Sequence, residues 1–237
     1  MAKSFKVLSA LLSYPTAELK EAAPEFGAVL SAEAVVPEDG RWLLDALIED
    51  FERLDLYELQ ERYVFLFDRT RSLSLHLFEH VHGESRDRGQ ALVDLQALYD
   101  EHGLEVAANE LPDYLPLFLE FLSTLPLDEA CELLRQPLHI IGALHERLRR
   151  RRSPYAAVFR ALQQIARQVP DAGELKALLA QPDDDPDDLA ALDRAWEDQP
   201  VSFGPGAATA EGCPRADDLL RRMGAEPLPG RTPSGNA

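Results

Sequence analysis

Apolar residues recur at helical spacing through most of the chain, with polar residues between them. Near the start, Phe5, Leu8 and Leu12 fall on one stripe of a helix. No stretch shows the sustained alternation of apolar and polar residues, rich in β-branched side chains, that is typical of a half-buried strand. The pattern therefore predicts an all-α fold.

Capping residues and prolines divide this pattern into separate helices. Thr16 is placed to cap the second helix, and Asp55 with Glu58 resembles a capping box that opens a later one. Gly103 stands where a left-handed residue ends a helix. Besides the helix after Thr16, the expected helices cover residues 4–12, 37–54, 55–67, 86–102, 112–124, 128–134, 137–151 and a last core helix that begins at residue 153. In the helix over residues 86–102, the side chains expected to face inward are Leu92, Leu95, Leu98 and Tyr99.

The composition changes after residue 170. Residues 171–237 contain runs of acidic residues and stretches of proline and glycine, which favour a largely disordered tail. A short helical pattern near residues 189–196 interrupts this tail. We therefore expect a single-domain helical bundle over residues 1–170, followed by an acidic, Pro/Gly-rich tail over residues 171–237.

The chain is strongly acidic, with 42 acidic and 24 basic residues among 237 and a formal net charge of -18. Such a charge repels nucleic acid phosphates and attracts a basic partner. Two cysteines are too few to indicate a disulfide framework. The sequence also lacks the run of about 18 apolar residues that a membrane span requires. We therefore expect a cytoplasmic protein that neither binds nucleic acid nor inserts into a membrane.

Polar groups that could carry chemistry are densest in residues 72–89, which contain three of the six histidines. On a helix, His76 and His80 would share a face with Glu79 beside them, and His-x-x-Glu-His is the order used by one class of zinc peptidases. There the histidines bind the metal and the glutamate is the general base. The alternative is that the histidines are partly buried and hydrogen-bonded to neighbouring carboxylates or carbonyls. A zinc-dependent hydrolase is thus one hypothesis for the function.

The same block places two arginines, Arg86 and Arg88, in the first turn of an expected helix. Cations at that end oppose the helix dipole, so other groups must compensate their charge. Either they pair with acidic residues of the block, or they form a recognition surface with its histidines and fix the polar groups of a partner.

Longer stretches resemble the NarJ family of nitrate reductase assembly chaperones. The run at residues 63–69 is similar to that family, as is the block at residues 73–95, which contains His-Leu-Phe-Glu-His-Val-His-Gly-Glu-Ser-Arg-Asp-Arg-Gly. A second stretch at residues 111–122, which reads Leu-Pro-Asp-Tyr-Leu-Pro-Leu-Phe-Leu-Glu-Phe-Leu, also resembles it. The similarity extends from residues 8–15 to residues 196–203 and so covers nearly the whole chain.

The resemblance implies an all-α chaperone without catalytic activity. Members of the family bind the N-terminal segment of the apo catalytic (alpha) subunit of respiratory nitrate reductase, and they keep it competent for insertion of the molybdenum cofactor before membrane attachment. Implied further partners are the alpha–beta complex and the proteins of molybdenum cofactor biosynthesis, and no cofactor is bound permanently. Carried over by position, the residues implied to contact the client are Tyr63, Phe67, Asp68, His76, Glu79, His80, His82, Arg86, Asp87, Arg88 and Asp113.

One position departs from the pattern of the wider family. A histidine there often follows the aspartate that matches Asp113, whereas this chain has Tyr114. The detailed contact at that position is therefore not carried over.

Overall fold

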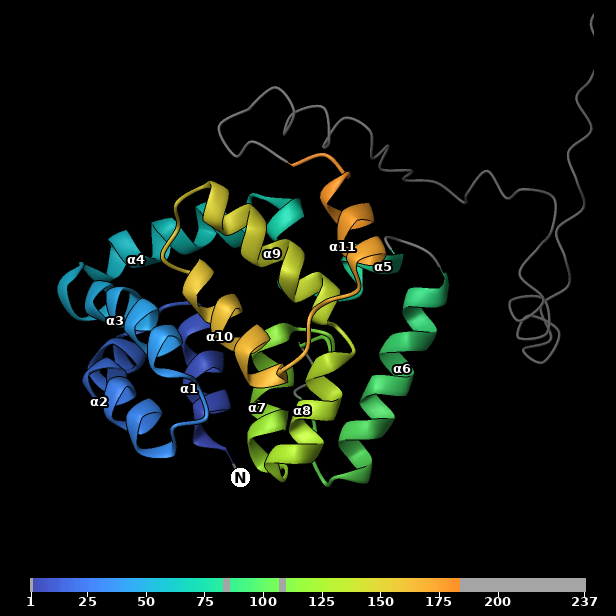
Figure 1. Ribbon diagram of the computed structural model, residues 1–237, viewed down its shortest axis with the longest axis horizontal. Helices are drawn as coiled ribbons and strands as arrows, with labels where there is room; N and C mark the ends of the chain where they lie inside the picture. The colour runs from blue at the N-terminus through green and yellow to red at the C-terminus, as the bar shows by residue number, and fades with distance from the viewer. Residues whose placement is uncertain (1, 83–85, 107–109, 184–237) are drawn as a thin grey trace, which may run out of the picture. The chain divides into compact units, whose positions relative to one another are not determined.

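Helices account for the regular secondary structure of residues 2–82, 86–106 and 110–183, which the computed structural model describes. These ranges contain no strand, so the predicted all-α fold is confirmed (Figure 1). In chain order the elements are α1 (Lys3–Leu12), α2 (Ala17–Glu33), α3 (Glu38–Arg53), α4 (Leu56–Tyr63), the π-helix η1 (Val64–Asp68), the 3-10 helix η2 (Arg71–Leu73), α5 (Glu79–His82), α6 (Arg86–Glu101), α7 (Leu115–Thr124), α8 (Leu127–Arg135), α9 (Leu138–Arg150), α10 (Ala156–Ala166) and α11 (Ala172–Leu179).

The helix ends predicted at Thr16, Asp55 and Gly103 are confirmed. The Thr16 side chain accepts a hydrogen bond from the backbone N–H of Leu19 at 3.3 Å and so caps α2. Asp55 accepts one from the backbone N–H of Tyr57 at 2.9 Å at the start of α4. Gly103 has a φ of 73°, which glycine adopts without the steric cost that a side chain would bring.

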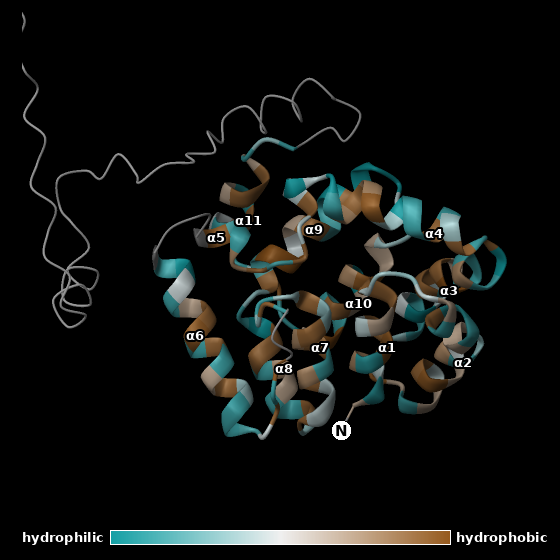
Figure 2. Cartoon of the chain, turned by 180° about the vertical axis from the view of Figure 1, so that it is seen from behind, coloured by the Kyte–Doolittle hydropathy of each residue, from teal (hydrophilic) through white to brown (hydrophobic). Residues whose placement is uncertain are grey.

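The core lies where α1 packs against α7 and α10 packs against α9. The α1 side chains of Phe5, Leu8 and Leu12 have no exposed surface, as the helical stripe predicted. Phe159 of α10 is likewise fully buried. Each such side chain stabilises the fold by roughly 1.5–3 kcal/mol through its removal from water. Figure 2 shows polar colour on α4 and the outer turns, away from this core.

Helix α6 attaches to the other helices mainly through Tyr99. This side chain is 1% exposed, its hydroxyl donates a hydrogen bond to the carbonyl of Pro112 at 2.8 Å, and its ring centroid lies 4.7 Å from that of Phe121. The leucines expected to face inward beside it are only partly buried. Figure 2 shows apolar and polar colour alternating along α6, which agrees with its incomplete burial.

The helix expected over residues 55–67 changes its hydrogen bonding at Val64. The backbone N–H of Arg69 donates to the carbonyl of Val64 at 2.9 Å, five residues back, as in a π-helix. Phe67 is 7% exposed, whereas Asp68 is exposed. Single π-turns inside helices are frequent at functional sites.

The helical part extends past the predicted boundary at residue 170. Helix α11 begins at Ala172, is capped by Asp171 and packs against α9 through the buried Leu178. The expected disordered tail beyond this helix, and the short helix expected near residues 189–196, lie outside the described residues.

None of the helices described by the structure combines the length and the apolar character that a bilayer span requires.

Candidate functional site

Two family-like stretches meet at a short backbone crossing. His76 and Tyr114 form an isolated antiparallel bridge. On either side of it, the N–H of Leu115 donates to the carbonyl of Leu75 at 2.8 Å, and the N–H of Leu77 donates to the carbonyl of Asp113 at 3.0 Å. The crossing brings side chains of the histidine-containing block next to those of residues 113–115.

The carboxylate of Asp113, next to this crossing, has no exposed surface. It accepts a hydrogen bond from the N–H of Phe78 at 3.0 Å, and it lies 3.2 Å from Nδ1 of His76. The Arg88 guanidinium lies 3.9 Å from Asp113 and donates a hydrogen bond to Glu79 at 3.2 Å. Because a buried carboxylate requires such partners, Asp113 fixes the positions of the block residues around it.

A cavity of about 230 Å³, which we call the aromatic hollow, lies next to the crossing. It is lined by Tyr14, Tyr63, Phe67, Asp68, Ser74, Leu75, His76 and Tyr114. Four of these eight residues, Tyr63, Phe67, Asp68 and His76, were predicted as client contacts, so the structure places four of the predicted residues around one cavity.

The aromatic rings of the hollow support one another. The rings of Tyr14 and Tyr63 pack edge to face with centroids 5.6 Å apart, and Phe67 lies 5.0 Å from Tyr63. The His76 ring lies 5.3 Å from that of Tyr114. The hydroxyls of Tyr63 and Tyr114 are 2.9 Å apart and share a hydrogen bond, so the walls of the cavity are joined.

The electrostatics of the hollow follow from burial. Burial raises the pKa of Tyr63 and that of Tyr114 above the usual tyrosine value, so both hydroxyls stay protonated near neutral pH. Partial desolvation also raises the pKa of the Asp68 carboxyl above its usual value, although the side chain stays exposed. A carboxylate in the same lining as several aromatic rings suits a cationic side chain, which is attracted both by the charge and by the aromatic quadrupoles.

The geometry contradicts the premise of the zinc site. His76 precedes α5, its ring is bound to Asp113, and it does not share a helix face with His80. The His80 ring is 8% exposed, and its Nε2 atom donates to the carbonyl of Ser74 at 2.8 Å. Burial lowers the pKa of His80 below the usual histidine value. Across the described ranges, no group of three or more His, Cys, Asp or Glu side chains could hold a metal ion.

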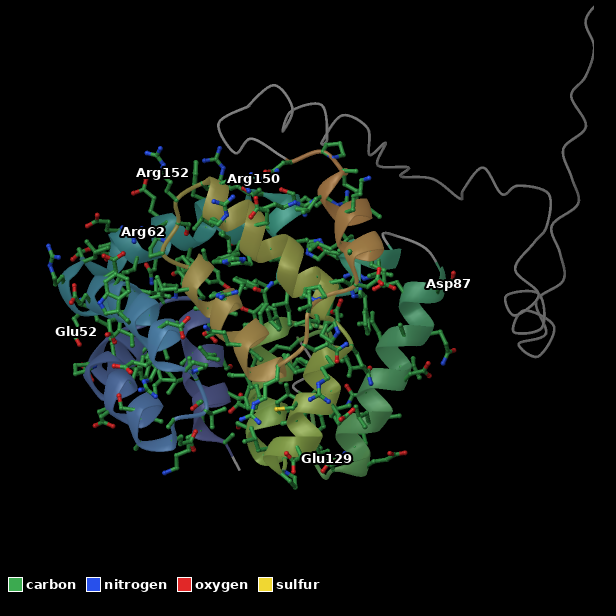
Figure 3. The ribbon with its side chains drawn as sticks, viewed as in Figure 1. Glu52, Arg62, Asp87, Glu129, Arg150 and Arg152 are labelled. Atoms are coloured by element: carbon green, nitrogen blue, oxygen red, sulfur yellow. The ribbon has the colours of Figure 1, made fainter. Side chains whose placement is uncertain are left out.

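The remaining predicted contacts lie outside the aromatic hollow. Glu79, Arg88 and Asp113 form a polar cluster, in which Arg88 lies close to both carboxylates. Asp87 is exposed in the first turn of α6 (Figure 3). His82 and Arg86 belong to α5 and α6, but their side chains lie outside the described residues.

Four of the eight residues that line the aromatic hollow were not predicted from the sequence. Tyr14, Ser74 and Leu75 lie within the family-like stretches, yet no spacing rule connects them, because Tyr14 and Tyr63 are far apart in sequence. Tyr114 was noted only as a departure from the family pattern. Its contact with the Tyr63 hydroxyl gives that departure a structural role.

Comparisons with known proteins agree with one another on the kind of relative that they find. The family model described as "Nitrate reductase delta subunit" matches residues 14–161. The chain is 42% identical over 198 residues to the nitrate reductase molybdenum cofactor assembly chaperone NarJ of Escherichia coli strain K12, which covers 83% of each protein. It is 38% identical over 224 residues, 94% of each protein, to the probable chaperone NarW of that strain. Against the probable NarJ chaperone of Bacillus subtilis it is 32% identical over 163 residues, 67% of this chain and 85% of that protein.

Proposed function

The chain belongs to the nitrate reductase delta subunit family, and on this premise we propose that it is an assembly chaperone for respiratory nitrate reductase. It binds the N-terminal segment of the apo catalytic (alpha) subunit. In doing so it keeps that subunit competent for insertion of the molybdenum cofactor before membrane attachment.

The observation that carries this proposal is the position of the aromatic hollow inside the matched region. Residues 14–161 include every residue that lines the hollow and the whole polar cluster around Asp113. The relatives that share this region are named as molybdenum cofactor assembly chaperones for nitrate reductase. The family match and the site therefore support the same function.

The hollow is suited to a basic, partly apolar client segment. One cationic side chain would lie against the rings of Tyr63 and Tyr114 with Asp68 as its counter-charge, while apolar side chains beside it contact the rim. Asp113, Glu79 and Arg88 act as positioning residues that fix His76. The exposed Asp87, together with His80, His82 and Arg86, extends the proposed contact surface beyond the hollow.

The molybdenum cofactor is cargo for the client and not a resident group of this protein. The chaperone binds no cofactor permanently and is not an enzyme. It works in the cytoplasm, where the alpha–beta complex and the proteins of molybdenum cofactor biosynthesis are its further partners. It does not bind nucleic acid.

Co-purification with the apo alpha subunit tests the proposal. We expect the chaperone to capture the full-length subunit and to lose most of that capture when the first few dozen residues of the client are removed. Equal capture of both forms would contradict binding through the leading segment.

A charge substitution tests the hollow itself. Asp68→Asn should weaken binding of the client segment about tenfold, because a charge-assisted contact becomes a neutral one. The matched control is Asp45→Asn, which changes the same charge at an exposed position of α3. Equal effects of the two substitutions in calorimetry would place the client elsewhere.

A further inference from the structure

A cavity of about 400 Å³, which we call the basic cavity, lies between α3, α9 and α10, and α10 packs against both of the other helices. Most of its lining is apolar or small, and cationic side chains complete it. The lining residues are Leu43, Ala46, His145, Arg149, Ser153, Pro154, Ala156, Ala157 and Arg160. None of them lines the aromatic hollow, so the two cavities are separate sites.

Exposed apolar side chains of α3 continue the surface of the basic cavity. Leu43 is 40% exposed, and Trp42, its neighbour in sequence, is 73% exposed. Ala46 follows Trp42 by one helical turn, so it lies on the same side of α3, and it is exposed as well. Large apolar residues that are exposed next to one another mark surfaces that bind a partner. This side of α3 is therefore available for an apolar contact.

Positive charge is in excess around the basic cavity. Arg149 and Arg160 line it, and both are exposed. Arg149 donates two hydrogen bonds to Glu146, at 2.8 and 2.9 Å, and Arg150 donates to the same carboxylate at 3.0 Å, so one carboxylate serves two guanidinium groups. Arg160 has no acidic partner among the described residues. Figure 3 shows Arg150 and Arg152 extending outward from this end of α9, so cations continue past the cavity.

The ring of His145, in the lining of the cavity, is subject to the same charge. Burial lowers the pKa of His145 below the usual histidine value, and the charges of Arg160 and Arg149 lower it further, against the effect of Glu146. The imidazole is therefore neutral near neutral pH, and the positive charge of the cavity comes from the arginines. Arginine keeps this charge at any physiological pH. The cavity thus combines an apolar lining with a fixed preference for anions.

The overall charge of the chain limits which anionic partner suits the basic cavity. A net charge of -18 repels an extended anionic surface such as a membrane or a nucleic acid. A short acidic segment would lie within about 10 Å of the arginines, a range beyond which salt screens the other charges of the chain. A small carboxylate would leave Trp42 unused, because that residue lies outside the lining. An acidic segment with apolar side chains on one face uses both the arginines and Trp42.

We propose that the basic cavity binds an acidic amphipathic segment of a partner protein. One apolar side chain of that segment occupies the cavity, and a second contacts Trp42. Its carboxylates pair with Arg149 and Arg160. Because the aromatic hollow suits a basic segment, the protein has two separate surfaces for segments of opposite charge. The inference stands on the basic cavity alone and does not rest on the proposed function.

Tryptophan fluorescence of the full-length chain tests the proposal. The chain has two tryptophans, so Trp196→Phe leaves Trp42 as the only one. The probe is a synthetic peptide in which leucine and phenylalanine recur at helical spacing between glutamates. We expect it to change the emission of Trp42 with a Kd on the order of 100 µM, as in a weak, transient contact. The same peptide with lysine in place of each glutamate should not bind. No change in emission, or equal binding of the lysine peptide, would overturn the proposal.

Charge substitutions in the same chain test the role of the two arginines. Arg149→Gln combined with Arg160→Gln should weaken binding of the acidic peptide about tenfold, because two charge-assisted contacts are lost. The matched control combines Lys6→Gln with Lys176→Gln, which removes two positive charges at exposed positions of α1 and α11. We expect the control to bind the peptide as the parent chain does. Equal weakening in the two variants would reduce the effect to net charge and overturn the proposal.

A substitution in the apolar lining locates the peptide independently. Ala46→Glu places a carboxylate at an exposed position of the cavity and should abolish binding of the acidic peptide by repulsion, whereas Ala28→Glu, at an exposed position of α2, should not. Unchanged binding in Ala46→Glu would place the peptide elsewhere and contradict the proposal. Sedimentation with phosphatidylglycerol vesicles separates the lipid alternative. Binding of these vesicles without binding of the acidic peptide would assign the cavity to an anionic lipid surface and overturn the proposal.

Discussion

At the scale of single residues, the buried carboxylate of Asp113 joins two segments that lie 37 positions apart. It accepts the N–H of Phe78 and contacts His76, while its own backbone carbonyl accepts the N–H of Leu77. Neither segment has enough regular structure to fix its own shape, because residues 74–78 precede α5 and residues 110–114 precede α7. A side chain outside the aromatic hollow therefore contributes to its shape, together with the backbone bonds of the crossing.

Asp113→Ala should lower the free energy of unfolding by about 3 kcal/mol, because it removes the carboxylate that contacts the Phe78 N–H and the His76 ring and leaves a cavity in its place. Urea denaturation measures this change. The control is Asp87→Ala at an exposed position of α6, which should shift stability by less than about 0.5 kcal/mol. Similar losses in both variants would contradict the role given to Asp113.

His80 should make the fold sensitive to acid. Burial holds its pKa in the folded state below the ordinary value of 6.5, so the unfolded chain takes up the proton first as the pH falls. The stability contributed by the neutral ring is therefore present above about pH 6.5 and is lost progressively below it.

We expect His80→Gln to flatten the dependence of unfolding free energy on pH between about 6.5 and 5, since glutamine can donate to the Ser74 carbonyl without titrating. Denaturant titrations at several pH values measure the slope. Val93→Ala, a non-titrating change at an exposed position of α6, is the control and should keep the native slope. An unchanged slope in His80→Gln would show that the ring does not couple to folding.

At the scale of elements, Tyr99 is the main buried anchor of α6. Tyr99 is its buried side chain, whereas Val93 of the same helix is 61% exposed. Tyr99→Ala should cost about 3 kcal/mol and accelerate hydrogen exchange over residues 86–101, because both a packed ring and a buried hydrogen bond are lost. Val93→Ala should leave exchange unchanged. Equal protection in the two variants would show that α6 is attached by other contacts.

The elements also show what the sequence could predict. Helical stripes such as that of α1 and caps such as Thr16 and Asp55 are local signals, and the structure confirms them. Helix α11 was missed because its segment lies among acidic and proline-rich residues, although it buries Leu178 against α9. The π-turn at Val64 was missed because hydrophobic periodicity alone does not reveal it.

The candidate site was predicted only in part, because its lining combines matched stretches with long-range contacts. Resemblance to a family selected Tyr63, Asp68 and His76 as client contacts, since whole stretches were matched, and the structure places these three residues around one cavity. The His-x-x-Glu-His spacing gave a wrong prediction, because residues 76–80 do not form a single helical turn. The contacts that actually define the cavity, such as that of Tyr14 with Tyr63, come from long-range packing, which a local motif does not encode.

At the scale of the whole molecule, the net charge of -18 bears on how fast a basic client segment is bound. Long-range attraction raises the association rate and is screened by salt. The association rate constant of a basic client peptide should fall about tenfold between about 50 mM and about 500 mM NaCl, while its dissociation rate changes less. Stopped-flow fluorescence separates the two rates, and a salt-independent association rate would contradict steering by the acidic surface.

Calorimetric titration of the purified chain with a peptide of the client's N-terminal segment is the most direct test of the chaperone assignment. We predict one-to-one binding that is weakened by Asp68→Asn and retained in Asp45→Asn. Absence of binding by the native chain, or binding that both substitutions leave unchanged, would contradict recognition of the client through the aromatic hollow.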